Sequence, residues 1–179
     1  MKLIVWLWNP WNQYVRTRHN AGFLILDELV ERHCWTQFLN QEKFGSLMAT
    51  GMIGSTQCIF LKPMLYMNKS WWPVQKVMNY YKIPSEHVLV VHDDIDIPVS
   101  ALKLKFNGSH GWHNGIRDIY ARTWSDRFWK LKWWVGRPGW KWEVIDYVLG
   151  KMSEDEYAEL VADWKSIDQR VEQFLKNSG

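Results

Sequence analysis

The sequence has few cysteines and shows none of the segments that direct a chain into a membrane or out of the cell. Its 179 residues include two cysteines, Cys34 and Cys58, which form no CxxC pair and no disulfide framework. No apolar run approaches the ~20 residues that a membrane-spanning helix needs. The first residues lead into a strand-like segment and show no signal-peptide cleavage pattern. These absences predict a cytoplasmic protein with no membrane contact, whose thiols are reduced and at least partly buried.

Phosphate-binding glycines and complete sets of metal ligands are missing as well. Where a dinucleotide-binding protein carries glycines after its first strand, residues 6–11 contain three tryptophans, which preclude a close approach to pyrophosphate. The aspartates of segment 92–96 lack the glycine and distal glutamate of a calcium-binding EF-hand loop. The histidines of segment 110–113 have no further cysteine or histidine to complete a zinc site. We therefore expect neither a metal nor an organic cofactor.

What the chain does contain is an ordinary globular composition. Hydrophobic residues make up 47% and charged residues 23%, with a net charge of +3. This length fits one domain over residues 1–179. Apolar runs and alternation predict strands at 2–8, within 47–61 with breaks at Gly51 and Gly54, and at 88–91, 102–106 and 131–135. Helical spacing predicts helices at 21–33, 73–81, 115–122 and 153–175. The alternation of strands and helices predicts an α/β domain with one mixed β-sheet flanked by helices.

Three polar segments follow predicted strands, where open α/β sheets place their functional sites. They are residues 9–20, 92–94 and 110–115. His19 is either an exposed histidine at a helix start or a general base, and position alone favours neither. Asp93 leaves a buried strand and needs a partner to stay charged, so it could orient His19. The spacing does not show that the two side chains meet.

Basic residues are concentrated between Leu102 and Lys141. This stretch has nine lysines and arginines against two aspartates, Asp118 and Asp126. Such an excess is typical of a surface that contacts a phosphate backbone, although charge alone is equally compatible with a solvated face.

The polar segments belong to an ordered set of short motifs. The set comprises Asn9-Pro10, residues 17–23 (TRHNAGF), Lys62-Pro63 with 66–70 (YMNKS), 92–96 (HDDID), 113–115 (HNG), and 136–138 (GRP) with 147–151 (YVLGK). In order and spacing across the chain, the set resembles bacterial-type peptidyl-tRNA hydrolases. The resemblance implies the fold of that family and a monomer without a cofactor.

The same resemblance implies an activity and its residues. The substrate would be peptidyl-tRNA, whose peptide–tRNA ester is hydrolysed so that tRNA from aborted translation is recycled. His19 would be the base that activates water, and Asp93 would orient it. Candidate substrate-binding residues are Asn9, Tyr14, Met67, Asn68 and Asn114. Candidate tRNA-phosphate contacts are Lys103, Lys105 and Lys132, the last at a position where the family usually has arginine.

Tryptophan is the main departure from the family pattern. The chain has 14 tryptophans, and those at 6, 8, 11, 71, 112 and 134 stand where the family usually has glycine. Glycine there would supply a positive φ or room for close approach, and tryptophan would cost on the order of 1–3 kcal/mol at each position. Either these tryptophans do not belong to the natural sequence, or their indoles line the cleft and stack on bases.

Two other functions therefore compete with the hydrolase. One is a catalytically impaired tRNA-binding module whose cleft is filled by Trp8, Trp11, Trp71 and Trp112. The other is a metal-dependent phosphohydrolase that uses Asp93, Asp94 and Asp96.

Overall fold

The computed structural model describes residues 1–7, 17–64, 71–94, 102–108, 116–119, 127–134, 144–162 and 164–177. The strands are β1 (Lys2–Trp6), β2 (Leu39–Gln41), β3 (Ser46–Ile53), β4 (Thr56–Pro63), β5 (Val88–Asp94), β6 (Leu102–Phe106) and β7 (Trp129–Trp134). The α-helices are α1 (Ala21–His33), α2 (Trp71–Tyr81), α4 (Val144–Leu149), α5 (Glu154–Ala162) and α6 (Trp164–Asn177). Short 3-10 turns are η2 (Arg18–Asn20), η3 (Glu42–Phe44) and η5 (Ser85–His87).

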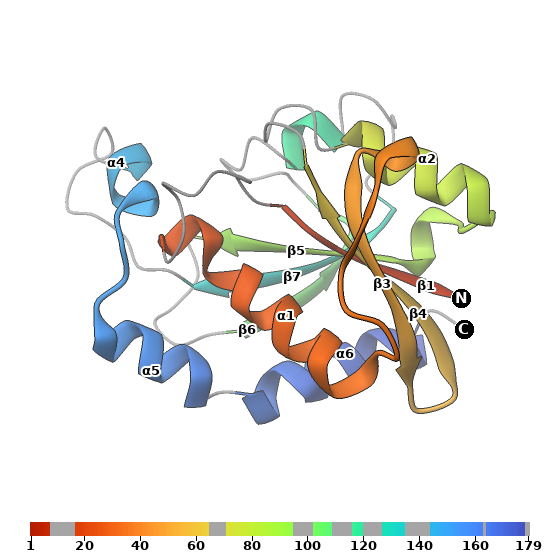
Figure 1. The fold of residues 1–179 in the computed structure, drawn as a ribbon. Helices are drawn as coiled ribbons and strands as arrows, with labels where there is room; N and C mark the ends of the chain where they lie inside the picture. The colour runs from red at the N-terminus through yellow and green to blue at the C-terminus, as the bar shows by residue number, and fades with distance from the viewer. Residues whose placement is uncertain are drawn as a thin grey trace.

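The strands form one mixed sheet in the order β2-β3-β4-β1-β5-β7-β6, which confirms the predicted α/β class. The four central strands β4, β1, β5 and β7 are parallel, whereas β2, β3 and β6 run antiparallel to their neighbours. The chain leaves β1 through α1 toward β4, and returns through α2 to β5 on the other side of β1 (Figure 1). The chain therefore crosses from one side of β1 to the other, and open α/β sheets place their sites at the carboxyl ends of the strands where such a switch occurs, here β1 and β5.

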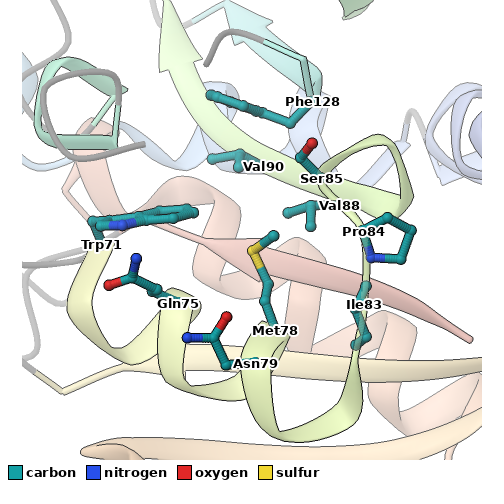
Figure 2. Close-up of a pocket in the computed structure, with 10 residues that line it drawn as sticks. All are labelled: Trp71, Gln75, Met78, Asn79, Ile83, Pro84, Ser85, Val88, Val90 and Phe128. Atoms are coloured by element: carbon teal, nitrogen blue, oxygen red, sulfur yellow. The ribbon is translucent and has the colours of Figure 1, made fainter. Parts of the chain in front are cut away.

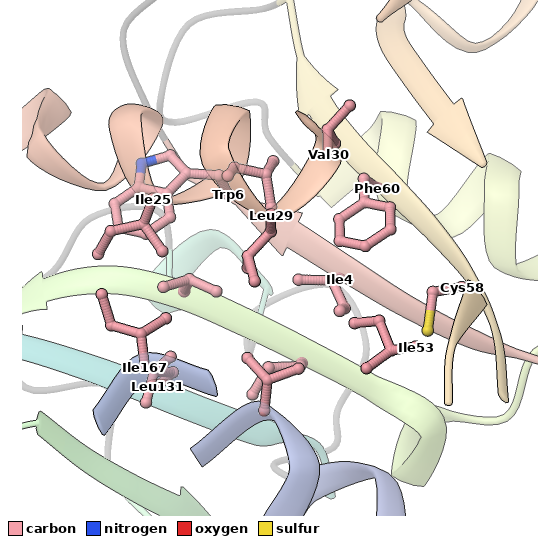
Figure 3. Packing of buried hydrophobic residues seen from close by; sticks show 14 of the residues in the cluster. Ile4, Trp6, Ile25, Leu29, Val30, Ile53, Cys58, Phe60, Leu131 and Ile167 are labelled. Atoms are coloured by element: carbon pink, nitrogen blue, oxygen red, sulfur yellow. The ribbon is translucent and has the colours of Figure 1, made fainter. Parts of the chain in front are cut away.

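Two apolar layers cover the sheet because successive side chains of a strand point to opposite faces. Ile4 and Trp6 of β1 pack against α1 and α6, as Figure 3 shows for part of this cluster. Leu3 and Val5 point the other way and pack against α2. Every residue of β1 is buried, so this strand is enclosed on both sides.

The bounds predicted for the first helix are confirmed, whereas the predicted break between strands at Gly51 is wrong. Gly51 lies inside β3, and only Gly54, with a φ of 59°, is in the turn that precedes β4. A Cβ on Gly51 would lie 2.2 Å from the carbonyl oxygen of His33 and 2.6 Å from Cα of Cys34. The glycine therefore allows the end of α1 to cross β3 at short range.

The single helix predicted over 153–175 is wrong, because α5 ends at Ala162 and α6 begins at Trp164. α5 begins with a capping box: Ser153 Oγ accepts the Glu156 N–H at 3.2 Å, and Glu156 Oε2 accepts the Ser153 N–H at 2.7 Å. The six-residue helix α4 and the three-residue strand β2 are not among the predicted elements.

Both thiols are free, as expected: Cys58 is buried and Cys34 is partly buried. Burial raises the pKa of Cys34 to about 12 and that of Cys58 to about 11, so both stay protonated at neutral pH. Among the described residues, no helix is long and apolar enough to cross a membrane.

The expected backbone strain does not arise at the tryptophans that the structure describes. In the described part of the chain, the non-glycine residues with positive φ are Lys82 and Asn107. Trp6 lies in β1, Trp71 begins α2, and Trp134 ends β7. Trp6 and Trp71 are instead buried with indole Nε1 atoms that find no hydrogen-bond acceptor among the described residues. Positions 8, 11 and 112 lie outside those residues.

Candidate active site

The turn that carries His19 is built by local hydrogen bonds just before α1. The backbone N–H of Asn20 donates to the carbonyl oxygen of Thr17 at 3.0 Å and to Thr17 Oγ1 at 3.3 Å. Asn20 occupies the N-cap position of α1, but its side chain makes no capping hydrogen bond. The resulting 3-10 turn holds the His19 side chain 11% exposed.

Asp93 reaches this turn from the sheet. It lies at the carboxyl end of β5, whose residue Val91 pairs with Trp6 at the end of β1. The β5 strand continues past β1, and its arrowhead lies beside the start of α1 in Figure 1. His19 Nδ1 lies 2.8 Å from Asp93 Oδ1, so the two residues that the spacing could not connect are in direct contact.

The electrostatics of the pair follow from its burial. Burial lowers the pKa of His19, but the charge of Asp93 and its hydrogen bond outweigh this effect and raise that pKa above its usual value of 6.5. A carboxylate at Nδ1 favours the tautomer with its proton on Nδ1, which leaves the Nε2 lone pair to accept a proton. The geometry is that of an imidazole oriented by a buried carboxylate, which is suited to the chemistry of a general base.

A second ion pair, which the sequence does not predict, involves Asp94, the next residue of β5, whose side chain points to the opposite face of the sheet from that of Asp93. Lys132 Nζ of β7 lies 2.5 Å from Asp94 Oδ2, with the side chains 16% and 10% exposed. The neighbouring His92 Nδ1 lies 2.7 Å from the carbonyl oxygen of Asp93. Lys132 is a predicted tRNA contact, and its ammonium lies on the carboxylate of Asp94, the residue that follows Asp93 in the sequence. The alternation of lysine and apolar residues in 130–134 gives no signal for this pairing.

The other two predicted tRNA contacts lie on the last strand of the sheet. Lys103 and Lys105 are exposed on β6, whereas Leu102 and Leu104 pack toward α6. The two lysines therefore point to the face opposite α6. In register beside them are Lys132 and Lys130 of β7, and the buried Lys130 Nζ donates to the carbonyl oxygen of Gly108 at 2.6 Å. Of these four lysines, Lys103 and Lys105 are exposed on β6, whereas Lys130 is buried and Lys132 is paired with Asp94.

The remaining predicted site residues lie outside the described residues. These are Asn9, Tyr14, Met67, Asn68 and Asn114. The same is true of Asp96, the third carboxylate of the metal alternative. Among the residues that the structure does describe, no group of three or more His, Cys, Asp or Glu side chains is arranged to hold a metal ion.

A cavity of about 350 Å³ lies on the α2 side of the sheet and is separate from the His19–Asp93 pair (Figure 2). It runs between α2, η5 and the first half of β5. Its lining residues are Trp71, Gln75, Met78, Asn79, Ile83, Pro84, Ser85, Val88, Val90 and Phe128. Trp71, one of the four tryptophans expected to fill the cleft, packs in the core of this side together with Val74 and Val77.

Fold and site together define an α/β enzyme with a buried histidine–aspartate pair at the carboxyl ends of its parallel strands. The sequence profile of the family described as peptidyl-tRNA hydrolase matches residues 3–178. The chain therefore belongs to the peptidyl-tRNA hydrolase family.

Individual relatives agree with this assignment. A peptidyl-tRNA hydrolase of Bacillus cytotoxicus is 37% identical over 178 residues, which cover 99% of this chain and 95% of the relative. One from Bacillus anthracis is 42% identical over 156 residues, or 87% and 83% of the two chains. The crystal structure of peptidyl-tRNA hydrolase from Acinetobacter baumannii superposes with a TM-score of 0.90 at 33% identity, covering 99% of this chain and 89% of that chain.

Proposed function

We propose that this chain hydrolyses the ester between the peptide and the tRNA of peptidyl-tRNA, with His19 as general base and Asp93 as its orienting partner. The observation that carries the proposal is the 2.8 Å contact between His19 Nδ1 and Asp93 Oδ1 in a protein of this family. A histidine held in this way is suited to the removal of a proton from water.

The reaction needs one base and a place for negative charge. His19 Nε2 takes a proton from a water molecule while the oxygen of that water attacks the ester carbonyl. Asp93 stabilises the imidazolium that forms. The tetrahedral intermediate then breaks its bond to the ribose oxygen, which receives the proton from His19. For the amides of Asn9, Asn68 and Asn114 we propose the positioning of substrate and the stabilisation of the oxyanion. For Tyr14 and Met67 we propose contact with the peptide.

The pH dependence tests the assigned role of His19. Only neutral imidazole acts as the base, so kcat/KM should rise with pH through an acid limb centred above 6.5, because the pKa of His19 is raised. Stability changes in the opposite direction: a raised folded-state pKa contributes stability below pH 6.5, and this is lost as pH rises through the folded pKa. The measurement is peptide release from peptidyl-tRNA across pH, corrected for uncatalysed hydrolysis. A rate that does not change from pH 5 to 8 would contradict the proposal.

The tRNA is proposed to lie against β6. Exposed Lys103 and Lys105 can contact backbone phosphates, whereas Lys132 has its charge compensated by Asp94. Replacement of both exposed lysines by glutamine should lower the slope of log KM against log salt concentration by about 1 for each phosphate that is no longer neutralised. Lys165→Gln is the matched control, because Lys165 is exposed on α6, on the opposite face of the sheet. Equal slopes in the double variant and the control would place the tRNA elsewhere.

The competing functions predict different results in the same assay. A metal-dependent phosphohydrolase would lose activity in EDTA, and an impaired module would bind tRNA in a salt-dependent manner without releasing peptide. We further propose that the enzyme acts in the cytoplasm as a monomer and needs no cofactor.

A further inference from the structure

Arg18, the residue before His19, is bound on several sides by the C-terminal part of the chain. Its Nε donates to Glu156 Oε1 at 2.9 Å and its Nη2 donates to Oε2 at 3.0 Å. Its Nη1 donates to the carbonyl oxygen of Tyr147 at 3.3 Å, and the guanidinium carbon lies 4.3 Å from the centre of the Tyr147 ring. Two parallel bonds to one carboxylate are a geometry that arginine provides and lysine does not.

Backbone contacts hold the same turn. The N–H of Arg18 donates to the carbonyl oxygen of Gly150 at 3.0 Å, and Thr17 forms an antiparallel bridge with Lys151. A Cβ on Gly150 would lie 3.0 Å from Arg18 Nη1 and 3.1 Å from the carbonyl oxygen of Tyr147. The end of α4 therefore packs directly on the turn that carries His19.

Glu156 is itself held in place. Its Oε2 accepts the backbone N–H of Ser153 in the capping box that begins α5. Burial alone would raise its pKa, but the hydrogen bonds from Arg18 and Ser153 and the charge of Arg18 lower it. The carboxylate is therefore ionised at neutral pH, and it links the start of α5 to the turn before α1.

We propose that Arg18 and Glu156 are positioning residues that fix the orientation of His19 toward Asp93. Arg18 and His19 are consecutive in η2, so a shift of one displaces the other. The turn is held between two carboxylates, Glu156 from the α5 side and Asp93 from the sheet. The inference rests on His19 being the catalytic base, and it requires no contact between Arg18 and substrate.

The other end of α1 offers a matched control. Arg32 Nη1 lies 3.2 Å from Asp168 Oδ2 of α6, and its guanidinium carbon lies 5.2 Å from the centre of the Trp164 ring. This arginine also joins α1 to a C-terminal helix through a carboxylate and an aromatic ring. It lies in the last turn of α1, whereas His19 lies before the first.

The experiment compares Arg18→Lys and Glu156→Gln with Arg32→Lys. For each variant we would measure kcat and KM on peptidyl-tRNA, the Tm, and the titration of the His19 imidazole by NMR. The first two variants should lower kcat by about 10- to 100-fold with little change in KM, as expected for a displaced catalytic group. Their His19 pKa should fall toward 6.5 as contact with Asp93 weakens. Arg32→Lys should change neither kcat nor the His19 pKa.

Two results would overturn the inference. One is a loss of kcat in Arg18→Lys no greater than in Arg32→Lys. The other is a His19 pKa that is unchanged in Arg18→Lys and Glu156→Gln, since the arginine would then act only on stability. The NMR titration needs no turnover, so it separates this inference from the proposed function. Full activity in His19→Ala would refute the proposed function, whereas an unmoved His19 pKa in the Arg18 variant would refute the positioning role.

Discussion

Replacement of His19 by alanine should lower kcat/KM on peptidyl-tRNA by about 100- to 10,000-fold, the usual contribution of general base catalysis. Asp93→Asn should cause a loss of similar size, because an asparagine amide can donate to Nδ1 and favour the wrong tautomer. The acid limb of the Asp93→Asn rate profile should also move to lower pH, since the charge that raises the pKa of His19 is gone. Both variants are measured by peptide release under single-turnover conditions.

The double variant makes this test sharper. If His19 and Asp93 act as one unit, the variant lacking both should be no slower than His19→Ala alone, so that the two effects are far from additive. His33→Gln is the control, because His33 lies at the far end of α1, the helix that follows His19, and its replacement should leave the rate unchanged. Additive losses would show that Asp93 contributes independently of the histidine.

Replacement of Lys62 by methionine should stabilise the protein by about 1–3 kcal/mol at pH 7, because a buried ammonium whose partner carboxylate stays 43% exposed contributes less than an apolar side chain of similar volume. Lys62 on β4 is 1% exposed, pairs with Asp27 of α1, and has its ammonium 4.1 Å from the centre of the Phe38 ring. Burial lowers the pKa of Lys62 to about 8 against the attraction of Asp27. A shift of this size means that the charged form of Lys62 costs the folded state about 3 kcal/mol relative to the unfolded state.

The direction of the stability change in Lys62→Met can be tested by its pH dependence and by a substitution of the partner residue Asp27. A lysine whose folded-state pKa is lowered favours folding fully above its unfolded value of 10.5, and this contribution is lost as pH falls through 8. The stability gained by Lys62→Met should therefore shrink between pH 8 and 10.5, as chemical denaturation can measure. Asp27→Asn should destabilise at pH 7, since the buried ammonium loses its partner. A loss of stability in Lys62→Met at pH 7 would contradict this interpretation.

Strongly periodic segments can be predicted from sequence, whereas segments fixed by tertiary contacts cannot. The helix Ala21–His33 has apolar residues at regular spacing, which local pattern alone reveals. In the sequence, Gly51 looks like a break between two strands. Its actual role, which is to let the end of α1 cross β3 closely, depends on a tertiary contact that the sequence does not show. The helix α4 is only six residues long, which is too short for a periodic pattern to reveal. It is held by tertiary contacts, such as that of the adjacent Gly150 with Arg18.

The candidate site also has features that the sequence predicts and features that depend on tertiary contacts. His19 and Asp93 are 74 positions apart in the sequence. Their places after predicted strands and the resemblance suggest that they act together, whereas the contact itself depends on the sheet register. The capping box at Ser153 is readable, but nothing in it indicates that Glu156 also binds Arg18. Likewise, the charge of Lys132 is readable, whereas its pairing with Asp94 depends on β5 and β7 being neighbours.

The central place of β1 also affects how the chain can fold as it is synthesised. β1 is translated before its partner strands, yet the parallel pairing aligns Lys2 with Cys58 and Leu3 with Val88. Until those residues emerge from the ribosome, an apolar segment that ends up buried on both faces has no strand to pair with. Such long-range pairing slows folding and leaves aggregation-prone surface exposed meanwhile. We therefore expect folding yield in the cell to depend on the time between the synthesis of β1 and that of its partners β4 and β5.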